Sequence, residues 1–396
     1  MRIFELTEYL PLRLLKAELS EQDGFRIYRE YGDQIDVEFP TPKTDNKWEL
    51  VSKGWVGYIP LNPELSISLK PKVALKNIFH MLEYAYRLRS LRFLAGLMAC
   101  DSLATFYQQL AKILARRVID RGRKGYYHTY VDISERLAYI SGRLDIDCLA
   151  RTPWRADLWC HYQNHTADVV ENQILAWTLR CIARTGICKE EVIPEVRRAY
   201  RGLQGLVRLT PFSAMDCVGR LYNRLNDDYE PLHVLCRFFL EHSGPTLSGG
   251  EHATLPFLID MARLYELFVA EWLAEHLPAR FYLKPQENVC VGPNGTWSFR
   301  IDIVIYDSAT GRAWAIADTK YKATDKPSPI DIAQVVTYAK LKECEEAILV
   351  YPAKLSSPID EKIGDVSVRS LTFNLSGDLE KGGSQFMSDL LEYFGN

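Results

Sequence analysis

The residues Ser298–Tyr321 read SFRIDIVIYDSATGRAWAIADTKY, two apolar runs separated by a short polar stretch. The β-branched and aromatic residues favour extended backbone, and the polar stretch favours a turn, so the segment predicts an antiparallel hairpin folded about Ala309–Thr310. Side chains alternate along a strand. The first strand therefore presents Asp302 next to Asp318 of the second strand, and Asp318 shares its face with Lys320. Two carboxylates and a lysine are expected to meet at one point of this sheet.

This predicted cluster needs a partner of positive charge, because like charges held together in a half-buried site repel each other. Mg²⁺ prefers hard oxygen ligands, keeps several waters and is satisfied by one or two carboxylates. We expect Asp302, Asp318 and the backbone carbonyl of Thr319 to be its ligands, with Mn²⁺ as a substitute ion. Lys320 would then polarise or deprotonate a water held by the metal ion, which attacks a phosphodiester in line. Each residue alone is better explained as a solvated strand residue, but the combined spacing on consecutive strands favours catalysis.

The helix expected after this hairpin adds side chains to the site. Ser328 precedes it and Asp331 follows three residues later, in a pattern typical of a capped helix start. Gln334 and Tyr338 are four residues apart and therefore share one helix face. A glutamine there can bind a phosphate, Lys320 or a water of the metal ion, with Tyr338 beside it. A position in the core is an equal alternative for Tyr338.

A further carboxylate is expected from the helix before the hairpin. Glu266 lies in the apolar stretch LYELFVAEW, residues 264–272. A carboxylate on such a helix needs a partner, which the metal ion or Lys320 would provide. A structural ion pair explains Glu266 nearly as well.

The length of 396 residues suits two or three domains. We expect an α+β multidomain protein with a β-rich N-terminal region at residues 1–72, a mainly helical middle region at 73–249, and a C-terminal α/β/α domain at 250–396. The strands expected in the first region are Arg2–Leu6, Gly24–Tyr28, Gln34–Phe39, Gly54–Ile59 and Leu65–Leu69.

In the middle region, helical periodicity runs over about 75–86, 94–118, 168–183 and 229–242, with a possible strand pair near Leu137–Leu144. Ser248–Gly250 predicts a flexible break. The last region is expected to contain a long helix, a strand and the hairpin, then a helix, two strands and a closing helix. Their expected bounds are Leu255–Leu277, Phe281–Val291, Ser298–Tyr306, Ala313–Tyr321, Pro329–Cys344, Ala347–Tyr351, Val366–Phe373 and Ser384–Phe394.

Bulk properties narrow the class of protein. The formal net charge is −3, so no global positive field attracts nucleic acid, although a local groove or a partner protein can supply it. The nine cysteines form no CxxC pair, which argues against a zinc ribbon or a disulfide framework and for a reducing compartment. The start lacks a signal-peptide pattern and no run approaches the roughly 20 apolar residues of a membrane span, so we expect a cytoplasmic protein. No GxxxxGK[ST] motif occurs, so the chain does not bind a nucleotide through a P-loop of its own.

The motif DTKYK followed by Q-x3-Y resembles PD-(D/E)xK nucleases, and McrC-like restriction subunits in particular. The resemblance extends over most of the chain from Gly54 onward. Its further parts are GWVGYIPLNPELSISLKPK, NIFHMLEYAY, ISGRLDI, ENQILAWTL, LNDDYEPLHVL and DMARLYELFV. By position, Asp302, Asp318 and Lys320 match the nuclease motif of the family, with Ile301 where the superfamily often has proline.

This resemblance implies a function as well as a fold. McrC-like proteins are the endonuclease partners of McrB-like AAA+ GTPase hexamers, which recognise and translocate DNA. The McrC-like subunit docks through its N-terminal part, stimulates nucleotide hydrolysis and cuts the DNA. The resemblance therefore implies residues 1–72 as a partner-docking region, residues 250–396 as the nuclease domain, and methylated duplex DNA as the substrate.

We therefore expect a Mg²⁺-dependent endonuclease subunit of a McrBC-like restriction complex. A scaffold that stimulates the AAA+ partner without cutting remains an alternative, although the intact carboxylates and lysine favour cleavage. A free-standing repair nuclease of the RecB-like kind is a third alternative, which the N-terminal 250 residues disfavour. The sequence leaves open whether the target is DNA or RNA.

Overall fold

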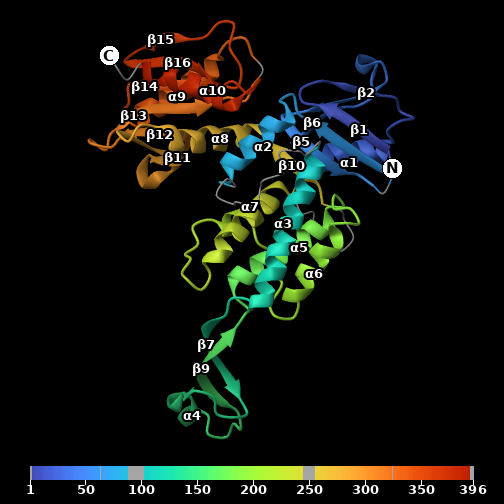
Figure 1. The fold of residues 1–396 in the computed structure, drawn as a ribbon, viewed down its shortest axis with the longest axis vertical. Helices are drawn as coiled ribbons and strands as arrows, with labels where there is room; N and C mark the ends of the chain where they lie inside the picture. Colours follow the sequence, from blue (N-terminus) through green and yellow to red (C-terminus); the bar gives the residue numbers. More distant parts are fainter. Residues whose placement is uncertain (1, 63, 88–101, 244–254, 323, 393–396) are drawn as a thin grey trace. The chain divides into compact units, whose positions relative to one another are not determined.

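The computed structural model describes residues 2–62, 64–87, 102–243, 255–322 and 324–392. The chain packs as two units, one made of Met1–Leu103 with Phe257–Asn396 and the other of Ala104–Pro256, and each is described by itself. Both units mix helices with strands, as expected from the sequence (Figure 1). Among the described residues, every helix is too short or too polar to cross a membrane.

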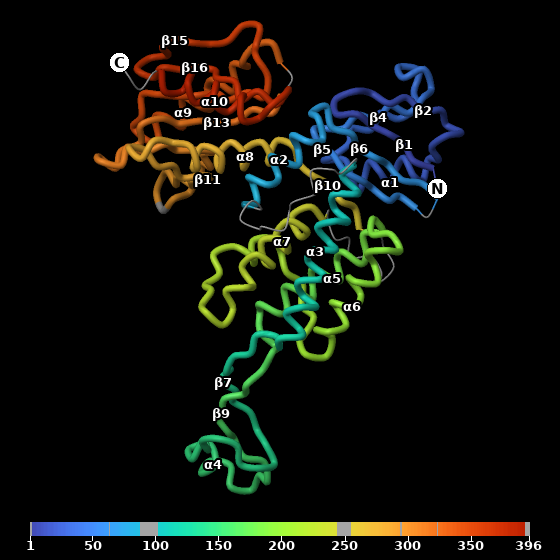
Figure 2. The backbone as a smooth tube through the Cα atoms, in the orientation of Figure 1, coloured from blue at the N-terminus to red at the C-terminus, as the bar shows by residue number. Residues whose placement is uncertain are grey.

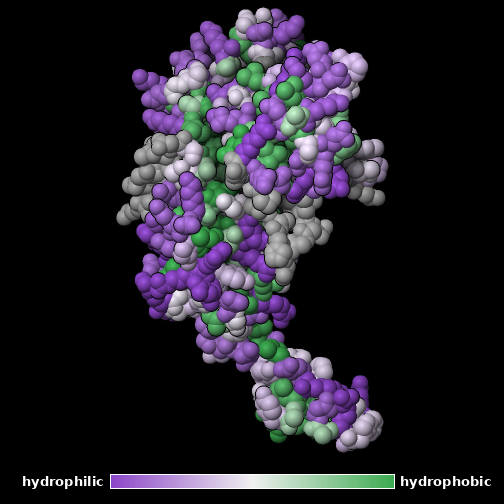
Figure 3. Space-filling model, turned by 90° about the vertical axis from the view of Figure 1, so that its right-hand side faces the viewer, coloured by the Kyte–Doolittle hydropathy of each residue, from purple (hydrophilic) through white to green (hydrophobic). Residues whose placement is uncertain are grey.

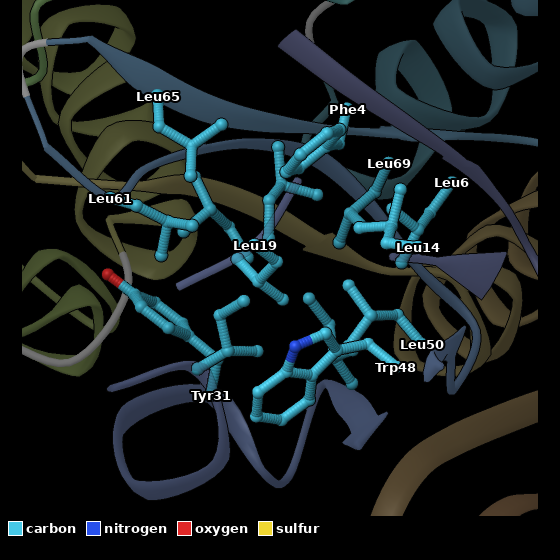
Figure 4. Packing of buried hydrophobic residues seen from close by; sticks show 14 of the residues in the cluster. Phe4, Leu6, Leu14, Leu19, Tyr31, Trp48, Leu50, Leu61, Leu65 and Leu69 are labelled. Carbon is cyan, nitrogen blue, oxygen red and sulfur yellow. The ribbon is translucent and has the colours of Figure 1, made fainter. Parts of the chain in front are cut away.

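Two small sheets and one helix build the N-terminal part of the first unit. The four-stranded sheet has the order β1 (Arg2–Thr7), β6 (Leu65–Lys70), β5 (Trp55–Pro60) and β10 (Phe257–Asp260). The three-stranded sheet has the order β2 (Leu12–Leu14), β4 (Trp48–Ser52) and β3 (Ile35–Glu38). With helix α1 (Glu21–Tyr31) they enclose a core of leucine, isoleucine and aromatic side chains that includes Phe4, Leu50 and the fully buried Trp48 (Figure 4).

The prediction of a strand at Gly24–Tyr28 is wrong, because these residues belong to α1. Ser20 caps the helix by accepting the backbone N–H of Asp23. Gly24 lets the helix approach the core closely, since a Cβ there would lie 2.3 Å from the ring of Trp48. The capping side chain is local, but the contact with Trp48 depends on tertiary packing, which periodicity over five residues does not reveal.

The sequence also misjudges the start of the long helix expected at Leu255–Leu277. Phe257–Asp260 forms β10 and pairs antiparallel with β5, and helix α8 (Met261–His276) begins only after it. The side chain of Asp260 accepts the backbone N–H groups of Ala262 and Arg263, which fixes the helix start. The pairing partner, β5 at Trp55–Pro60, lies far earlier in the chain, so local periodicity could not indicate the strand.

The second half of the first unit is a six-stranded sheet with helices against it. Its order is β11 (Phe281–Val291), β12 (Trp297–Asp307), β13 (Ala313–Thr319), β14 (Glu346–Tyr351), β16 (Val366–Thr372) and β15 (Asp360–Ile363). All these strands except β15 are as predicted, as are helices α9 (Pro329–Leu341) and α10 (Leu379–Leu391) within a few residues. The exposed four-residue β15 was not predicted.

Helices cover both faces of this sheet. Val304, Ile316 and Leu349 pack in one cluster with Val335 of α9. Their neighbours along the strands, such as Ile303, are equally buried, so the opposite face is also covered. Helices α8 and α10 contact β13 and β16 and meet each other through Trp272 and Phe386.

Helix α2 (Leu75–Ala85) belongs to the first unit, although the sequence division puts it at the start of a middle region. It packs against α8, where the rings of Tyr84 and Phe268 lie 5.6 Å apart. The side-chain amide of Asn77 donates to the carbonyls of Leu375 and Gly377, both at 2.8 Å. The three-region division at 72/73 and 249/250 stays a prediction.

The second unit is mainly helical, as expected. It contains α3 (Leu103–Lys124), α5 (Val170–Arg184), α6 (Ile193–Leu203) and α7 (Glu230–His242). Strands border the segment Leu137–Leu144, where a strand pair was expected, but they do not pair with each other. Their sheet has the order β7 (Thr129–Leu137), β9 (Leu158–Thr166) and β8 (Arg143–Leu144), so both pair with β9. Figure 2 shows β7 and β9 side by side with the short helix α4 (Ile146–Arg151) at their far end. Residues 94–101 of an expected helix and the expected break at Ser248–Gly250 lie outside the described residues.

Candidate active site

The hairpin of β12 and β13 brings the predicted carboxylates together. Ile303 pairs with Ala317 and Val304 with Ile316 in an antiparallel register, and continuing this register puts Asp302 opposite Asp318. Directly opposed residues of antiparallel strands point to the same face. Both carboxylates therefore lie on one face of the sheet, as the alternation of the sequence predicts.

Thr319 fixes the carboxylate of Asp302. Its backbone N–H donates to Oδ2 of Asp302 at 2.9 Å, and its side-chain hydroxyl donates to the same oxygen at 3.0 Å. The sequence suggested only the carbonyl of Thr319 as a site group, so this double hydrogen bond was missed.

Lys320 lies at the centre of the cluster. Its backbone N–H donates to the carbonyl of Val350 at 2.8 Å, which continues the pairing of β13 with β14. Its ammonium Nζ lies 2.5 Å from Oδ2 of Asp318 and 3.9 Å from Oδ1 of Asp331. Asp318 is only 1% exposed, so this ion pair is almost free of solvent screening.

Helix α9 orients the ammonium of Lys320 from the other side. Nζ donates to Oε1 of Gln334 at 3.0 Å, and Nε2 of Gln334 donates to the hydroxyl of Tyr338 at 2.8 Å. The Ser328 hydroxyl accepts the backbone N–H of Asp331, as the predicted cap requires. The structure thus brings Gln334 to the lysine in a hydrogen-bonded chain. Tyr338 serves this chain and the hydrophobic core at the same time.

Asp331 and Lys322 lie next to Lys320, which the sequence did not predict: Asp331 was expected only as part of a helix cap. Nζ of Lys322 lies 2.8 Å from Oδ1 of the nearly buried Asp331, and Nζ of Lys320 approaches the same oxygen. Burial acts to raise the pKa of Asp331, but the hydrogen bonds from Lys322 and Ser328, with the charge of Lys322, hold it below its usual value. The signal was present in the DTKYK motif and in the cap pattern, but only folding puts the two next to each other.

The carboxylate of Glu266 in α8 interacts with the cluster through its charge. Oε1 accepts a hydrogen bond from Nε2 of Gln286 at 2.8 Å, and Arg263 and Arg300 lie 4.0 Å from the carboxylate. Burial raises the pKa of Glu266, and the negative charge of Asp302 raises it further. Glu266 therefore adds negative potential beside Asp302, while its hydrogen bond comes from Gln286, a partner that the sequence did not indicate.

The main electrostatic cost of the site is the burial of Asp318 beside the carboxylate of Asp302. Burial raises the pKa of Asp318 to about 7, the charge of Asp302 raises it as well, and Lys320 opposes both. Burial lowers the pKa of Lys320, but the carboxylates of Asp318, Asp331 and Asp302 outweigh it and the net shift is upward. Lys320 is therefore a firmly charged hydrogen-bond donor in this arrangement.

The donor atoms of the site fit a small divalent cation. Oδ2 of Asp318 is buried, and its charged neighbour is the ammonium of Lys320, 2.5 Å away. Across the parts of the chain that the structure describes, no three His, Cys, Asp or Glu side chains gather as a metal-binding group. Two carboxylates with one carbonyl suit Mg²⁺, which keeps much of its water shell. Asp302, Asp318 and the Thr319 carbonyl are thus chemically suited to hold it.

Comparisons with known proteins agree with the motif resemblance. The family described as McrBC 5-methylcytosine restriction system component matches residues 50–352. No curated protein matches the sequence. A chain of a Thermococcus gammatolerans structure, described as a refined half-complex from a tetradecameric assembly of McrB AAA+ hexamers with bound McrC, is similar in fold. The TM-score is 0.55 at 15% identity, over 99% of this chain and 100% of that chain.

A second T. gammatolerans structure, of the McrBC complex, matches 70% of this chain and 88% of that chain with a TM-score of 0.44 at 15% identity. At such identities the likeness of the first structure shows a shared fold, and the second adds no argument.

Proposed function

The chain belongs to the family of McrBC 5-methylcytosine restriction system components, as a McrC-like member, and we propose that it is the endonuclease subunit of such a complex. In this proposal the C-terminal sheet with α8, α9 and α10 is a PD-(D/E)xK nuclease domain that hydrolyses DNA phosphodiester bonds. One observation carries the proposal: buried Asp318 lies opposite Asp302 on adjacent strands, with Nζ of Lys320 at 2.5 Å.

Each residue of the site has a role that follows from its contacts. Asp302, held by Thr319, and Asp318 would bind Mg²⁺ together with the Thr319 carbonyl. When bound, the cation would supply Lewis-acid stabilisation of the negative charge on the reacting phosphate. Lys320, held by Gln334, would donate a charged hydrogen bond to a phosphate oxygen as that charge develops. Tyr338 keeps Gln334 in place and is a positioning residue.

The partner is proposed to be a McrB-like AAA+ GTPase. The similar T. gammatolerans structure contains McrB AAA+ hexamers with bound McrC. A partner that grips the DNA would explain how a chain of net charge −3 meets a polyanion. The partner would then select the DNA, proposed to be methylated duplex, while this chain stimulates GTP hydrolysis and cuts.

Exposed apolar side chains offer two surfaces for such a partner. In the N-terminal region, which is the proposed docking region, Phe25 and Tyr28 of α1 are 58% and 57% exposed. In the second unit, the sheet of β7, β8 and β9 with α4 exposes Tyr139, Ile146 and Trp154. Figure 3 shows hydrophobic side chains among hydrophilic ones at this sheet, at the lower end of the view. Apolar side chains grouped on a surface often mark a protein contact.

The test compares cleavage of long methylated duplex DNA by the wild-type protein and by Asp318→Asn, with Mg²⁺. Each is assayed alone and with the AAA+ protein and GTP. The proposal requires that the wild type cuts only with partner and GTP, and that Asp318→Asn never cuts while still stimulating GTP hydrolysis. Asp365→Asn, an exposed carboxylate variant in the same domain, is the matched control and should cut normally.

Two other outcomes would replace the proposal. If wild type and Asp318→Asn both stimulate GTP hydrolysis and neither cuts DNA or RNA, the chain is an activator of the AAA+ partner that does not cut. Cleavage by the wild type alone, unaffected by the partner, would indicate a free-standing nuclease of the RecB-like kind.

A further inference from the structure

A cavity of about 450 Å³ lies in the first unit next to the end of strand β13. It is lined by Tyr9, Lys72 and the two residues before α2, together with residues that include Tyr321, Lys322 and Leu375. Its volume lies within the range of small-molecule and cofactor sites, and its walls are mostly apolar with a few polar groups, as such sites require. Nothing in the catalytic arrangement uses this cavity.

The cavity begins where the reactive strand ends. Tyr321 and Lys322 directly follow Lys320 in the sequence. The ammonium of Lys322 lies 2.8 Å from Asp331, and the same Asp331 oxygen lies 3.9 Å from Lys320. One shared carboxylate thus separates the lysine of the cavity from the lysine of the site. A molecule in the cavity would therefore be a near neighbour of the scissile bond.

The side chains of the cavity combine aromatic rings with ammonium groups. Tyr9 is 40% exposed, and Nζ of Lys72 lies 5.4 Å from the centre of its ring. Tyr321 is 9% exposed and is fixed by its hydrogen bond to Glu8. An aromatic ring offers a stacking surface to any base, and an ammonium group attracts the phosphate that is linked to it. Bases and phosphates alternate in one class of ligand, the nucleotides.

A neighbouring cavity favours a nucleic-acid strand as the ligand over a single free nucleotide. Ser376 lines the first cavity and also a second one of about 590 Å³, which contains Lys354 and Lys381 beside Asp378 and Asp389. The space available to a ligand therefore continues past the first cavity along the same side of the unit. A chain of nucleotides can follow such a path, whereas a free nucleotide would fill only its beginning.

We propose that the cavity lined by Tyr9, Lys72, Tyr321 and Lys322 binds one nucleotide of the substrate DNA strand, turned out of the duplex stack, beside the bond that is cut. The base lies against a tyrosine ring and its phosphate against Lys72. This binding site deepens the proposed nuclease function and rests on it for the identity of the strand. The cavity would hold the strand in register with Lys320 whichever sequence it has, because stacking and phosphate contacts are insensitive to sequence.

The experiment measures binding separately from cleavage. The full-length protein is titrated into a fluorescein-labelled dT12 oligonucleotide in EDTA, and anisotropy is recorded at low and moderate salt. Tyr9→Ala should weaken binding about tenfold, since stacking of one base contributes roughly that factor or more. Tyr9→Phe keeps the ring and should bind like the wild type. Lys72→Gln should weaken binding and reduce its salt dependence.

The matched control is Lys76→Gln, an exposed lysine of α2 that does not line the cavity, and it should leave binding unchanged. Equal binding by wild type, Tyr9→Ala and Lys72→Gln would overturn the proposal. Full displacement of bound dT12 by free GTP or dAMP at the same concentration as the oligonucleotide would overturn the proposal of a strand and indicate a free-nucleotide site.

The two proposals can fail separately. Asp318→Asn should still bind dT12 although it does not cut, because the cavity does not contain that residue. If Tyr9→Ala loses dT12 binding but the wild-type protein never cuts DNA, the proposed nucleotide site stands and the nuclease proposal fails. If Tyr9→Ala cuts DNA and binds dT12 like the wild type, the proposed nucleotide site fails and the nuclease proposal stands.

Discussion

The hydroxyl of Tyr321 donates a hydrogen bond to Oε2 of Glu8 at 3.3 Å, across 313 positions of the sequence. Glu8 is fully buried at the end of β1, and its Oε2 also accepts the backbone N–H of Lys72 at 2.9 Å. Its other oxygen, Oε1, is buried without a hydrogen-bond partner. Because Tyr321 follows Lys320 directly, this contact ties the N-terminal sheet to the reactive strand.

Glu8→Gln should change how stability depends on pH. Burial raises the pKa of Glu8, and hydrogen bonds from Lys72 and Tyr321 only partly offset it. Between the ordinary value and the raised pKa the folded state binds more protons than the unfolded state, so wild-type stability falls as pH rises through this window. Glutamine does not titrate, so the stability of the variant should not fall as pH rises through this window. Urea unfolding midpoints at pH 4, 6 and 8 measure it.

Glu5→Gln is the control for this prediction, because Glu5 is an exposed residue of the same strand. Its stability profile should follow that of the wild type. A constant difference between wild type and Glu8→Gln at all three pH values would show that Glu8 is not a buried titrating group.

Mg²⁺ should stabilise the wild type and leave Asp318→Asn unaffected. A ligand that binds only the folded state raises its stability, by an amount on the order of 5 °C in melting temperature at roughly 100-fold excess over its Kd. Asp318→Asn removes a charged ligand oxygen and should abolish the rise. Thermal unfolding with and without MgCl2 measures it, with Asp365→Asn expected to respond like the wild type. An equal rise in Asp318→Asn would place the ion elsewhere.

Tyr338→Phe should reduce cleavage through the position of Lys320. It removes the hydroxyl that accepts the hydrogen bond of Gln334 and leaves the buried ring in place. One such hydrogen bond is worth about 1 kcal/mol, which corresponds to a loss of roughly fivefold in the cleavage rate. Gln334→Ala removes the whole chain to Lys320 and should cost more. Single-turnover cleavage with partner and GTP gives these rates.

Thr337→Ala tests whether these losses are specific, because Thr337 is exposed on the same helix and bonds only to the helix backbone. Its rate should remain that of the wild type. A rate for Gln334→Ala equal to that of Thr337→Ala would remove Gln334 from the site.

Docking of the AAA+ partner should depend on the exposed aromatic side chains of α1. The double variant Phe25→Ala and Tyr28→Ala should reduce stimulation of GTP hydrolysis by about tenfold or more, since buried aromatic anchors carry much of the energy of an interface. Stimulation is measured over a range of subunit concentrations. Trp154→Ala removes a 79% exposed aromatic from the other apolar surface. Loss of stimulation in Trp154→Ala alone would move the docking surface to the second unit.

The elements around the site could be predicted because their signals are local. The β12–β13 hairpin follows from two-residue alternation, which also determines that Asp302, Asp318 and Lys320 share a face. The start of α9 follows from Ser328 and Asp331, three residues apart. The strand predicted at Gly24–Tyr28 failed because a short apolar run fits a helix face as well as a strand.

The sequence by itself therefore determined the family, the reactive hairpin and the residues that carry its charge, since these depend on neighbours within a few turns or one strand pair. Only the tertiary structure decided that Thr319 fixes Asp302, that Gln286 binds Glu266, and that β10 joins the N-terminal sheet. It also decided that Glu8 meets Tyr321 at the wall of a cavity. Such contacts join residues far apart in the chain, and their partners are selected by the packing of whole sheets and helices, which no local pattern records.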